Sequence, residues 1–144
     1  MQIKFEVDTF ALMGKVEKLR KAAVAGATEA ALADIAPYVP RDIGTLMNSA
    51  ELHSDIAAGE LVWATPYARY QYYGEVYGPN YPIYEGGALP SAYYSPPVKE
   101  KTGRKIKHKK GRNPKATAKW AEVAADECAG DWVRAAQKAM GKVK

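Results

Sequence analysis

The chain has 144 residues, the size of one domain, and it carries a net charge of +5 at pH 7. Only 25 residues are Ile, Leu, Val or Phe, so the subunit is not expected to have a large hydrophobic core of its own. Alanine and ten tyrosines supply further apolar surface, which predicts a subunit that packs against neighbouring subunits. A single cysteine, Cys128, excludes an internal disulfide and a cysteine-built metal site, and it suits a reducing compartment such as a bacterial cytoplasm. The chain has no apolar run of about 20 residues and no signal-peptide pattern, so we expect it neither to span a membrane nor to be secreted through a signal peptide.

The N-terminal quarter predicts one short strand and one long helix. Residues 2–7 alternate polar and apolar side chains, as a half-buried strand does. Asp8 then occupies a helix N-cap position, and apolar residues recur at steps of three and four to about Ala36. Pro37 and Pro40 end this helix, because proline lacks a backbone N–H and disfavours helical geometry in the residue before it.

Two compact elements are predicted next. Residues 41–49 are expected to form a turn with one or two helical turns, in which Asp42 caps the backbone N–H groups of Gly44 and Thr45. Residues 51–56 and 60–64 are rich in Leu, Ile, Val and Trp and are expected to pair as a β-hairpin.

A short helix is predicted to follow. Thr65 and Pro66 stand in the favoured order of an N-cap and a first-turn proline, and Gly74 is expected to end the helix. The tyrosines of this helix, spaced three apart, share one face: Tyr67, Tyr70 and Tyr73.

The last third combines an irregular segment with a long helix. Residues 75–98 are rich in Pro, Gly and Tyr and predict a loop or irregular hairpin. Asn113 and Pro114 are expected to begin the last helix. Its predicted apolar face comprises Trp120, Val123, Ala124, Cys128, Trp132, Val133, Ala136 and Met140.

The residue pattern gives no support for catalysis. His53 and His108 lack a metal-ligand spacing and are expected to be ordinary surface histidines. There is no nucleophile elbow, phosphate-binding glycine loop or Cys/His pair, so we expect no catalytic, metal-binding or cofactor-binding residues and no enzyme. Three acidic residues of the last helix are expected to form its solvated face: Asp126, Glu127 and Asp131.

Residues 99–112 are strongly basic, with eight basic side chains and one acidic one. Three interpretations stay open: a solvated loop, a contact with DNA or phosphate, and docking on an acidic protein surface. The candidate DNA or phosphate contacts are Lys99, Lys101, Arg104, Lys105, Lys107, Lys109, Lys110 and Arg112.

Nine of the ten tyrosines lie between residues 67 and 94, which indicates either a local aromatic core or a contact surface. Because few large aliphatic residues are present to cover them, we expect part of this set to contact another subunit. The candidates for subunit or partner contact are Tyr72, Tyr73, Tyr77, Tyr81, Tyr84, Tyr93 and Tyr94.

Two segments in order resemble a known family. Residues 38–49, Tyr-Val-Pro-Arg-Asp-Ile-Gly-Thr-Leu-Met-Asn-Ser, are similar to the Pro-x-Asp-x-Gly-x-Leu-x-x-Ser signature of the tail-completion and minor capsid (head-tail joining) proteins of long-tailed bacteriophages. Residues 67–74, Tyr-Ala-Arg-Tyr-Gln-Tyr-Tyr-Gly, resemble the Tyr-Ala-x-Tyr-x-x-x-Gly element of that family. The matched positions have structural rather than chemical roles: Pro40, Asp42, Gly44, Leu46, Ser49, Tyr67, Tyr70 and Gly74.

This resemblance implies an α+β fold in which a small antiparallel β-sheet packs against a long N-terminal helix and a long C-terminal helix. Residues 1–144 would form one such domain, with a Tyr/Pro- and Lys-rich loop or hairpin inserted at about 75–112. It also implies a noncatalytic virion protein without a cofactor, assembled in the host cytoplasm into a hexameric ring at the phage neck or the upper end of the tail. The implied partners are other copies, connector or stopper proteins, and tail terminator or tube proteins; the basic residues 99–112 add nonspecific contact with genomic DNA as a further expectation. The alternative is a DNA-binding protein acting through residues 99–112.

Overall fold

The computed structural model describes residues 8–108 and 110–144, so the strand expected over residues 2–7 lies outside the described residues. The helices are α1 (Thr9–Ile35), the 3-10 helix η1 (Ala36–Tyr38), α2 (Thr45–His53), α3 (Ala68–Tyr73) and α4 (Trp120–Met140). The strands are β1 (Glu75–Gly78), β2 (Tyr81–Ile83), β3 (Ala92–Tyr94) and β4 (Glu100–Lys105). The expected α+β class, with a long helix near each end of the chain, is confirmed.

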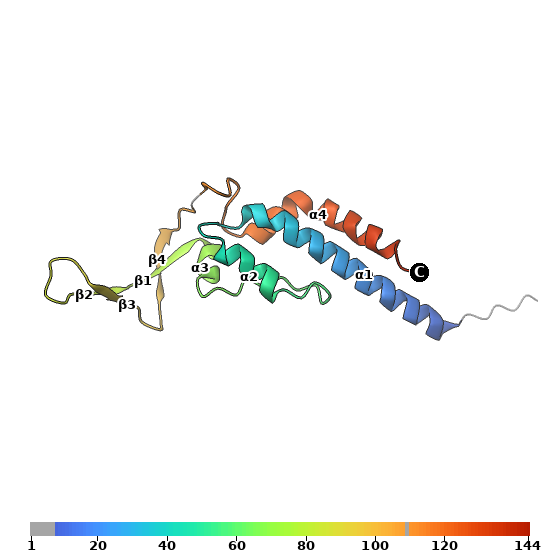
Figure 1. The fold of residues 1–144 in the computed structure, drawn as a ribbon, viewed down its shortest axis with the longest axis horizontal. Helices are drawn as coiled ribbons and strands as arrows, with labels where there is room; N and C mark the ends of the chain where they lie inside the picture. The colour runs from blue at the N-terminus through green and yellow to red at the C-terminus, as the bar shows by residue number, and fades with distance from the viewer. Residues whose placement is uncertain (1–7, 109) are drawn as a thin grey trace, which may run out of the picture.

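The helices α1 and α4 lie side by side and antiparallel along the length of the molecule (Figure 1). Asp8 caps α1 as expected, because its Oδ1 accepts a hydrogen bond from the backbone N–H of Ala11 at 3.0 Å. The two helices pack closely at Gly26, where an added Cβ would lie 2.7 Å from Ala139 Cβ. Since Ala139 is next to the end of α4, the N-terminal part of α1 continues beyond its partner (Figure 1).

A small core joins these helices to α2 and α3. Its buried apolar residues are Ala31, Ile35, Tyr38, Val39, Leu46, Ala68, Trp120 and Ala124. The Trp120 ring meets the Tyr72 ring edge-on at 4.8 Å between centroids and the Trp63 ring at 5.8 Å. At the other side of the helix pair, Trp132 Nε1 donates to Asp34 Oδ2 at 3.0 Å, so aromatic side chains tie α4 to the rest of the body at two places.

The start of α4 differs from the expectation, because the helix begins at Trp120 and not at Asn113. Asn113 is buried, and its Nδ2 donates to the carbonyl oxygens of Ala36 at 3.0 Å and Val39 at 2.8 Å. These carbonyls lie at the end of the first helical segment, where the Val39 N–H donates to the Ala36 carbonyl at 3.3 Å and the helix has few further donors to offer. The predicted apolar face is also too wide, since Val133 is mostly exposed.

The region between α1 and α3 is more helical than predicted. The expected hairpin is wrong because α2 continues to His53, leaving one isolated bridge between Asp55 and Glu60. A helix keeps Leu46, Ser49 and Ala50 buried on one side, a spacing that fits the helical period.

The start of α3 is also later than expected. It begins at Ala68, and Thr65 contributes its backbone carbonyl, which accepts from the Ala68 N–H at 3.0 Å, in place of a side-chain cap. The predicted end is confirmed, since Gly74 has a positive φ of 64°.

The strands form two antiparallel ribbons, β1 with β4 and β2 with β3. In contrast to the expected sheet against the helices, both ribbons project from one end of the helical body (Figure 1). The reason is that β2, β3 and β4 are exposed along their whole length, and β4 contains no apolar residue to form a packing face. Part of the basic run, residues 99–112, is therefore a strand and not a loop.

None of the helices within residues 8–108 and 110–144 combines the length and apolar character that crossing a bilayer requires.

Candidate partner-binding surfaces

Residues 75–105, here called the arm, leave the helical body and return to it at adjacent points. The backbone N–H of Ile106 donates to the carbonyl of Gly74 at 2.9 Å, which closes the base of the arm. Gly103 has a φ of +75° inside β4, next to an irregularity in the pairing with β1, and glycine adopts this conformation without strain. The arm is thus a bent two-stranded ribbon with both ends anchored at its base.

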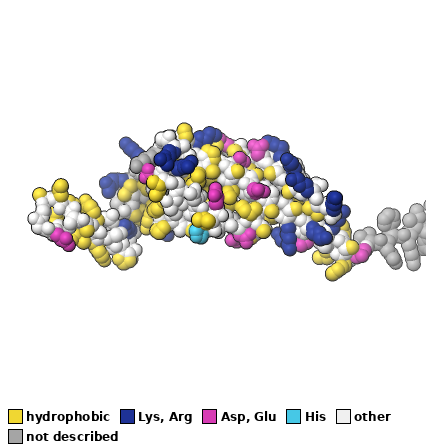
Figure 2. Space-filling view, in the orientation of Figure 1, with side chains coloured by type: hydrophobic (Ala, Val, Ile, Leu, Met, Phe, Trp, Pro, Cys, Tyr) yellow, Lys and Arg dark blue, Asp and Glu magenta, His cyan; other side chains and the backbone are white. Residues whose placement is uncertain are grey.

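The outer part of the arm, residues 79–98 or the arm tip, is apolar on both faces. Tyr81 pairs with Tyr94 and Pro82 with Tyr93, and successive strand residues point to opposite faces. Among these 20 residues Glu85 alone is charged. Figure 2 shows yellow hydrophobic side chains along the arm and dark blue ones where it joins the body. Exposed apolar side chains concentrated in this way mark an interaction surface.

The candidate tyrosines divide into two groups. Tyr72 and Tyr77 already have partners within the chain: Tyr72 packs on Trp120, and Tyr77 lies 4.9 Å from the Tyr70 ring. Burial, with the Glu122 carboxylate nearby, raises the pKa of the Tyr72 hydroxyl. The tyrosines that expose about half of their surface or more are Tyr73, Tyr81, Tyr84, Tyr93 and Tyr94. These exposed rings are the stronger candidates for partner contact.

The basic run divides in the same way. Lys101 and Lys105 form salt bridges with Glu75 at 2.7 and 3.4 Å, and the Lys101 ammonium beside Glu75 holds the pKa of that carboxyl below its usual value. Lys99 donates to Asn80 Oδ1 at 2.8 Å. Lys109 lies outside the described residues. Four candidates form no salt bridge with any residue of the described chain: Arg104, Lys107, Lys110 and Arg112.

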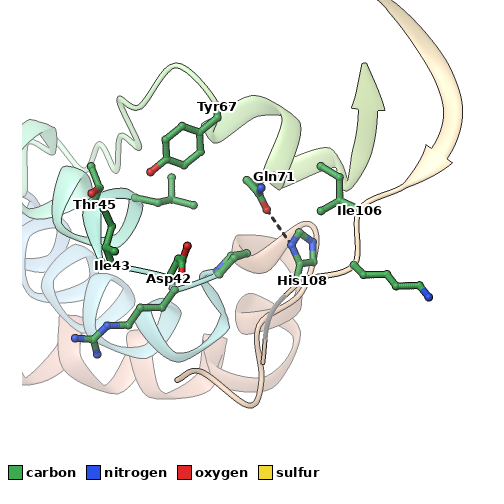
Figure 3. Close-up of a pocket in the computed structure, with 12 residues that line it drawn as sticks. Asp42, Ile43, Thr45, Tyr67, Gln71, Ile106 and His108 are labelled. Atoms are coloured by element: carbon green, nitrogen blue, oxygen red, sulfur yellow. Dashed lines mark hydrogen bonds between the residues drawn. The ribbon is translucent and has the colours of Figure 1, made fainter. Parts of the chain in front are cut away.

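A pocket of about 410 Å³ lies between the first motif, in residues 38–49, and the base of the arm (Figure 3). Five of the motif positions line it: Pro40, Asp42, Gly44, Leu46 and Tyr67. The other walls come from Gln71 of α3 and from residues 106–108. The φ of Gly44 is +98°, so a glycine at this position lets α2 begin without backbone strain.

The remaining motif positions serve the fold instead of this pocket. Ser49 is buried, and its Oγ donates to the Leu46 carbonyl at 2.7 Å. Tyr70 packs on Tyr77. At Gly74 an added Cβ would lie 2.9 Å from Ala118 Cβ, so glycine permits the close approach of α3 to the segment before α4.

The two histidines differ from each other. His53 is exposed as expected, whereas the expectation for His108 is wrong because it is half-buried at the pocket. Its Nδ1 lies 3.0 Å from Gln71 Oε1, which accepts its proton, and Figure 3 shows the two side chains facing each other. Burial, together with the positive charge of Lys110, lowers the pKa of His108, so the ring is held neutral.

Acidic residues of α4 have no metal-binding or catalytic arrangement in the described structure. Asp126, Glu127 and Asp131 are exposed as predicted, and the described residues contain no cluster of three potential metal ligands. Glu127 accepts a hydrogen bond from the Tyr38 hydroxyl, which lowers the pKa of the carboxyl. Lys115 joins the same pair, with its Nζ 3.0 Å from the Tyr38 oxygen. This cluster fastens α4 to the end of the first helical segment.

Sequence reasoning missed one exposed surface, at the beginning of α1. Phe10, Leu12, Met13 and Val16 are largely exposed there, although the helical period assigned Leu12 and Val16 to a packed face. Helix length explains this surface, because α1 has 27 residues and α4 has 21, so α4 cannot cover α1 completely. The difference was not visible in the sequence, because the last helix was expected to begin at Asn113 and would then be about as long as α1.

The chain matches the family described as "Minor capsid protein" over residues 3–140, and it belongs to that family. No match was found among curated proteins or among solved structures. Membership in this family makes the chain a structural component of the bacteriophage virion.

Proposed function

We propose that this minor capsid protein forms a ring, most simply a hexamer, at the phage neck or the upper end of the tail. The ring completes the tail, joins it to the head and leaves a channel through which the genome passes. Its partners are further copies of the chain, the connector or stopper on the head side, and the tail terminator or tube proteins on the tail side.

The observation that carries this proposal is the arm. It extends away from a body whose own core is already filled by Trp120 and Tyr72, and it exposes aromatic side chains that no described residue of the same chain covers. A subunit built in this way gains apolar burial only by contact with another molecule, because the hydrophobic effect scales with the area removed from water. Assembly into a larger particle supplies that contact.

Microscopy of the virus tests the location. We expect cryo-electron microscopy of virions, together with antibody labelling against this chain, to place its density in a ring at the head-tail junction. Particles assembled without the chain should accumulate as separate heads and tails. Labelling spread over the capsid shell, or detection only in cell lysate and never in virions, would contradict the proposal.

A second candidate function is DNA binding through residues 99–112. The observation that favours it is the set of four basic side chains without an acidic partner in the described chain, which lie at the base of the arm and just beyond it. Such side chains release counterions from a phosphate backbone without reading sequence, so affinity falls steeply with salt.

The test compares two double variants with the same loss of charge. We expect R104Q/K107Q to weaken retention of double-stranded DNA and to flatten its dependence on salt concentration, because each phosphate contact contributes about one unit of slope. The control K138Q/K142Q removes two basic residues from the end of α4 and should leave retention unchanged. If both variants weakened DNA retention equally, the retention would depend on net charge alone and not on a site at residues 99–112.

A further inference from the structure

The first part of α1, residues 9–21, is a helix whose apolar face is left exposed by the described residues. Phe10 is 88% exposed and Met13 is 72% exposed, and Leu12 and Val16 each expose more than half of their surface. At 100° per residue these four side chains fall within one continuous arc of the helix surface. We call this segment the α1 extension.

The α1 extension is uncovered because α4 ends too early. Gly26 of α1 lies against Ala139, next to the end of α4, and α1 continues for 17 further residues toward its N-terminus. No described residue covers the apolar arc of residues 9–21, so contact with a second molecule would remove this area from water.

The arm tip lies at the opposite end of the molecule (Figure 1). It is the other large apolar surface, with Leu89 82% and Tyr93 61% exposed. Fully buried aromatic side chains cover about 150–250 Å² each, so its half-exposed rings and aliphatic neighbours approach the order of one partner's share, about 800 Å², of a standard interface. One elongated subunit thus carries two different uncovered apolar surfaces, one at each end.

The two surfaces are complementary in charge as well as in polarity. Residues 9–21 contain four basic side chains and one acidic one, and Lys15 and Lys18 form no salt bridge within the described chain. The arm tip offers Glu85 and the faces of its tyrosine rings, both of which attract cations. Two α1 extensions placed together would instead oppose like charges.

We propose that the arm tip of one copy packs on the α1 extension of the next copy. This inference rests on the proposed ring and names the surfaces that build it. Phe10 and Met13 of one copy contact Leu89 and Tyr93 of its neighbour, and Lys15 or Lys18 lies beside Glu85. Because the two surfaces differ, the contact is head-to-tail, and repetition with a fixed rotation closes a ring.

Cysteine cross-linking of the purified full-length protein tests the pairing directly. In a C128S background, the double variant M13C/L89C should yield a ladder of disulfide-linked oligomers on oxidation, whereas M13C alone and L89C alone should stay monomeric. Dimers from M13C alone would assign α1 to a symmetric contact with itself, and dimers from L89C alone would do the same for the arm. Either result, or the absence of any cross-link, would overturn the proposal.

Substitutions with a matched control measure the contribution of each surface. By sedimentation velocity, F10Q/M13Q and L89S/Y93S should each weaken self-association about tenfold or more, as loss of central apolar contacts does. The control L52Q/V133Q changes two similarly exposed side chains on α2 and α4 and should have no effect. An unchanged circular dichroism spectrum shows that each variant is folded. If the control variant self-associated as weakly as the test variants, the assignment of these surfaces would be overturned.

Mixing separates head-to-tail contact from the symmetric alternatives. An equimolar mixture of F10Q/M13Q and L89S/Y93S retains one intact pair of surfaces between unlike subunits, so it should form heterodimers and no larger species. Failure of the mixture to associate would contradict the proposal. Microscopy tests the location in the virion separately. A neck ring without these cross-links would support the proposed function and contradict this contact between copies. Cross-links in a protein located elsewhere in the virion would support the contact and contradict the proposed function.

Discussion

Aromatic side chains are used differently in the helical body and in the arm. In the body, Trp120 is 1% exposed and Tyr72 packs edge-on against it, so these rings hold α3 and α4 together. In the arm, Tyr81, Tyr93 and Tyr94 stand on a ribbon too thin to cover them. The same residue type therefore supports folding in one region and stays exposed in the other. Pairs of like residues from the two regions provide ways to test this division.

The largest difference is expected between Trp120 and Tyr93. Trp120→Ala should lower the free energy of unfolding by about 3–5 kcal/mol, because a large buried side chain leaves a cavity. Tyr93→Ala should change it by less than about 0.5 kcal/mol, as exposed substitutions do. Urea denaturation followed by circular dichroism measures both. A large loss at Tyr93 would mean that the arm contributes to folding and would erase the distinction.

Two asparagines provide the next comparison. Asn113→Ala should cost about 1–3 kcal/mol, because it removes the side-chain donor of the buried Val39 carbonyl and one of the two donors to the Ala36 carbonyl. Asn80→Ala removes only an exposed hydrogen bond from Lys99 and should change the free energy of unfolding by less than about 0.5 kcal/mol. Thermal and urea unfolding of the two variants should rank them in this order. Equal losses would show that Asn113 does not clamp the helix end.

Glycines in the two halves of α1 should respond with opposite signs. Gly26→Ala would force its Cβ against Ala139 and should destabilise the protein by about 1–2 kcal/mol, since α4 has to shift. Gly14→Ala meets nothing within 4 Å and should stabilise it by about 0.5–1 kcal/mol through helix propensity. The midpoint of thermal unfolding reports both. Stabilisation by Gly26→Ala would mean that α1 and α4 are less closely packed than described.

The smallest effect is expected from pH at His108. The folded state lowers its pKa below the ordinary value of 6.5, so the unfolded chain binds more protons, and stability should fall as pH drops through 6.5 and level off below the folded-state pKa. Denaturation at pH 8 and pH 5.5 should show a larger loss for the wild type than for His108→Gln. A wild-type slope equal to that of His108→Gln would contradict this assignment.

Sequence reasoning succeeded where the signal is local. Asp8 and Gly74 mark helix ends because a cap or a positive φ depends on a few neighbouring residues. It failed at Asn113, whose side chain binds carbonyls more than 70 residues away, a contact that no local pattern encodes. The helix-start pattern of Asn113 and Pro114 was therefore misleading.

The candidate sites followed the same rule. The tyrosine-rich and lysine-rich segments were found from composition, but composition does not divide their members into exposed and internally paired ones. Tyr72 is paired by the distant Trp120 and Lys101 by Glu75, whereas Tyr77 is paired by Tyr70 within the same segment. The pocket between the first motif and His108 was not predicted, since it depends on how the base of the arm returns to α3.

The hydrogen bond between Ile106 and Gly74 has a consequence for the evolution of this protein. Because the arm leaves and returns at neighbouring points, its length can change while the body keeps its own contacts, at the modest entropic cost of closing a longer or shorter loop. The residues between Gly78 and Glu100 can therefore change in number and kind while the contacts of the body stay the same.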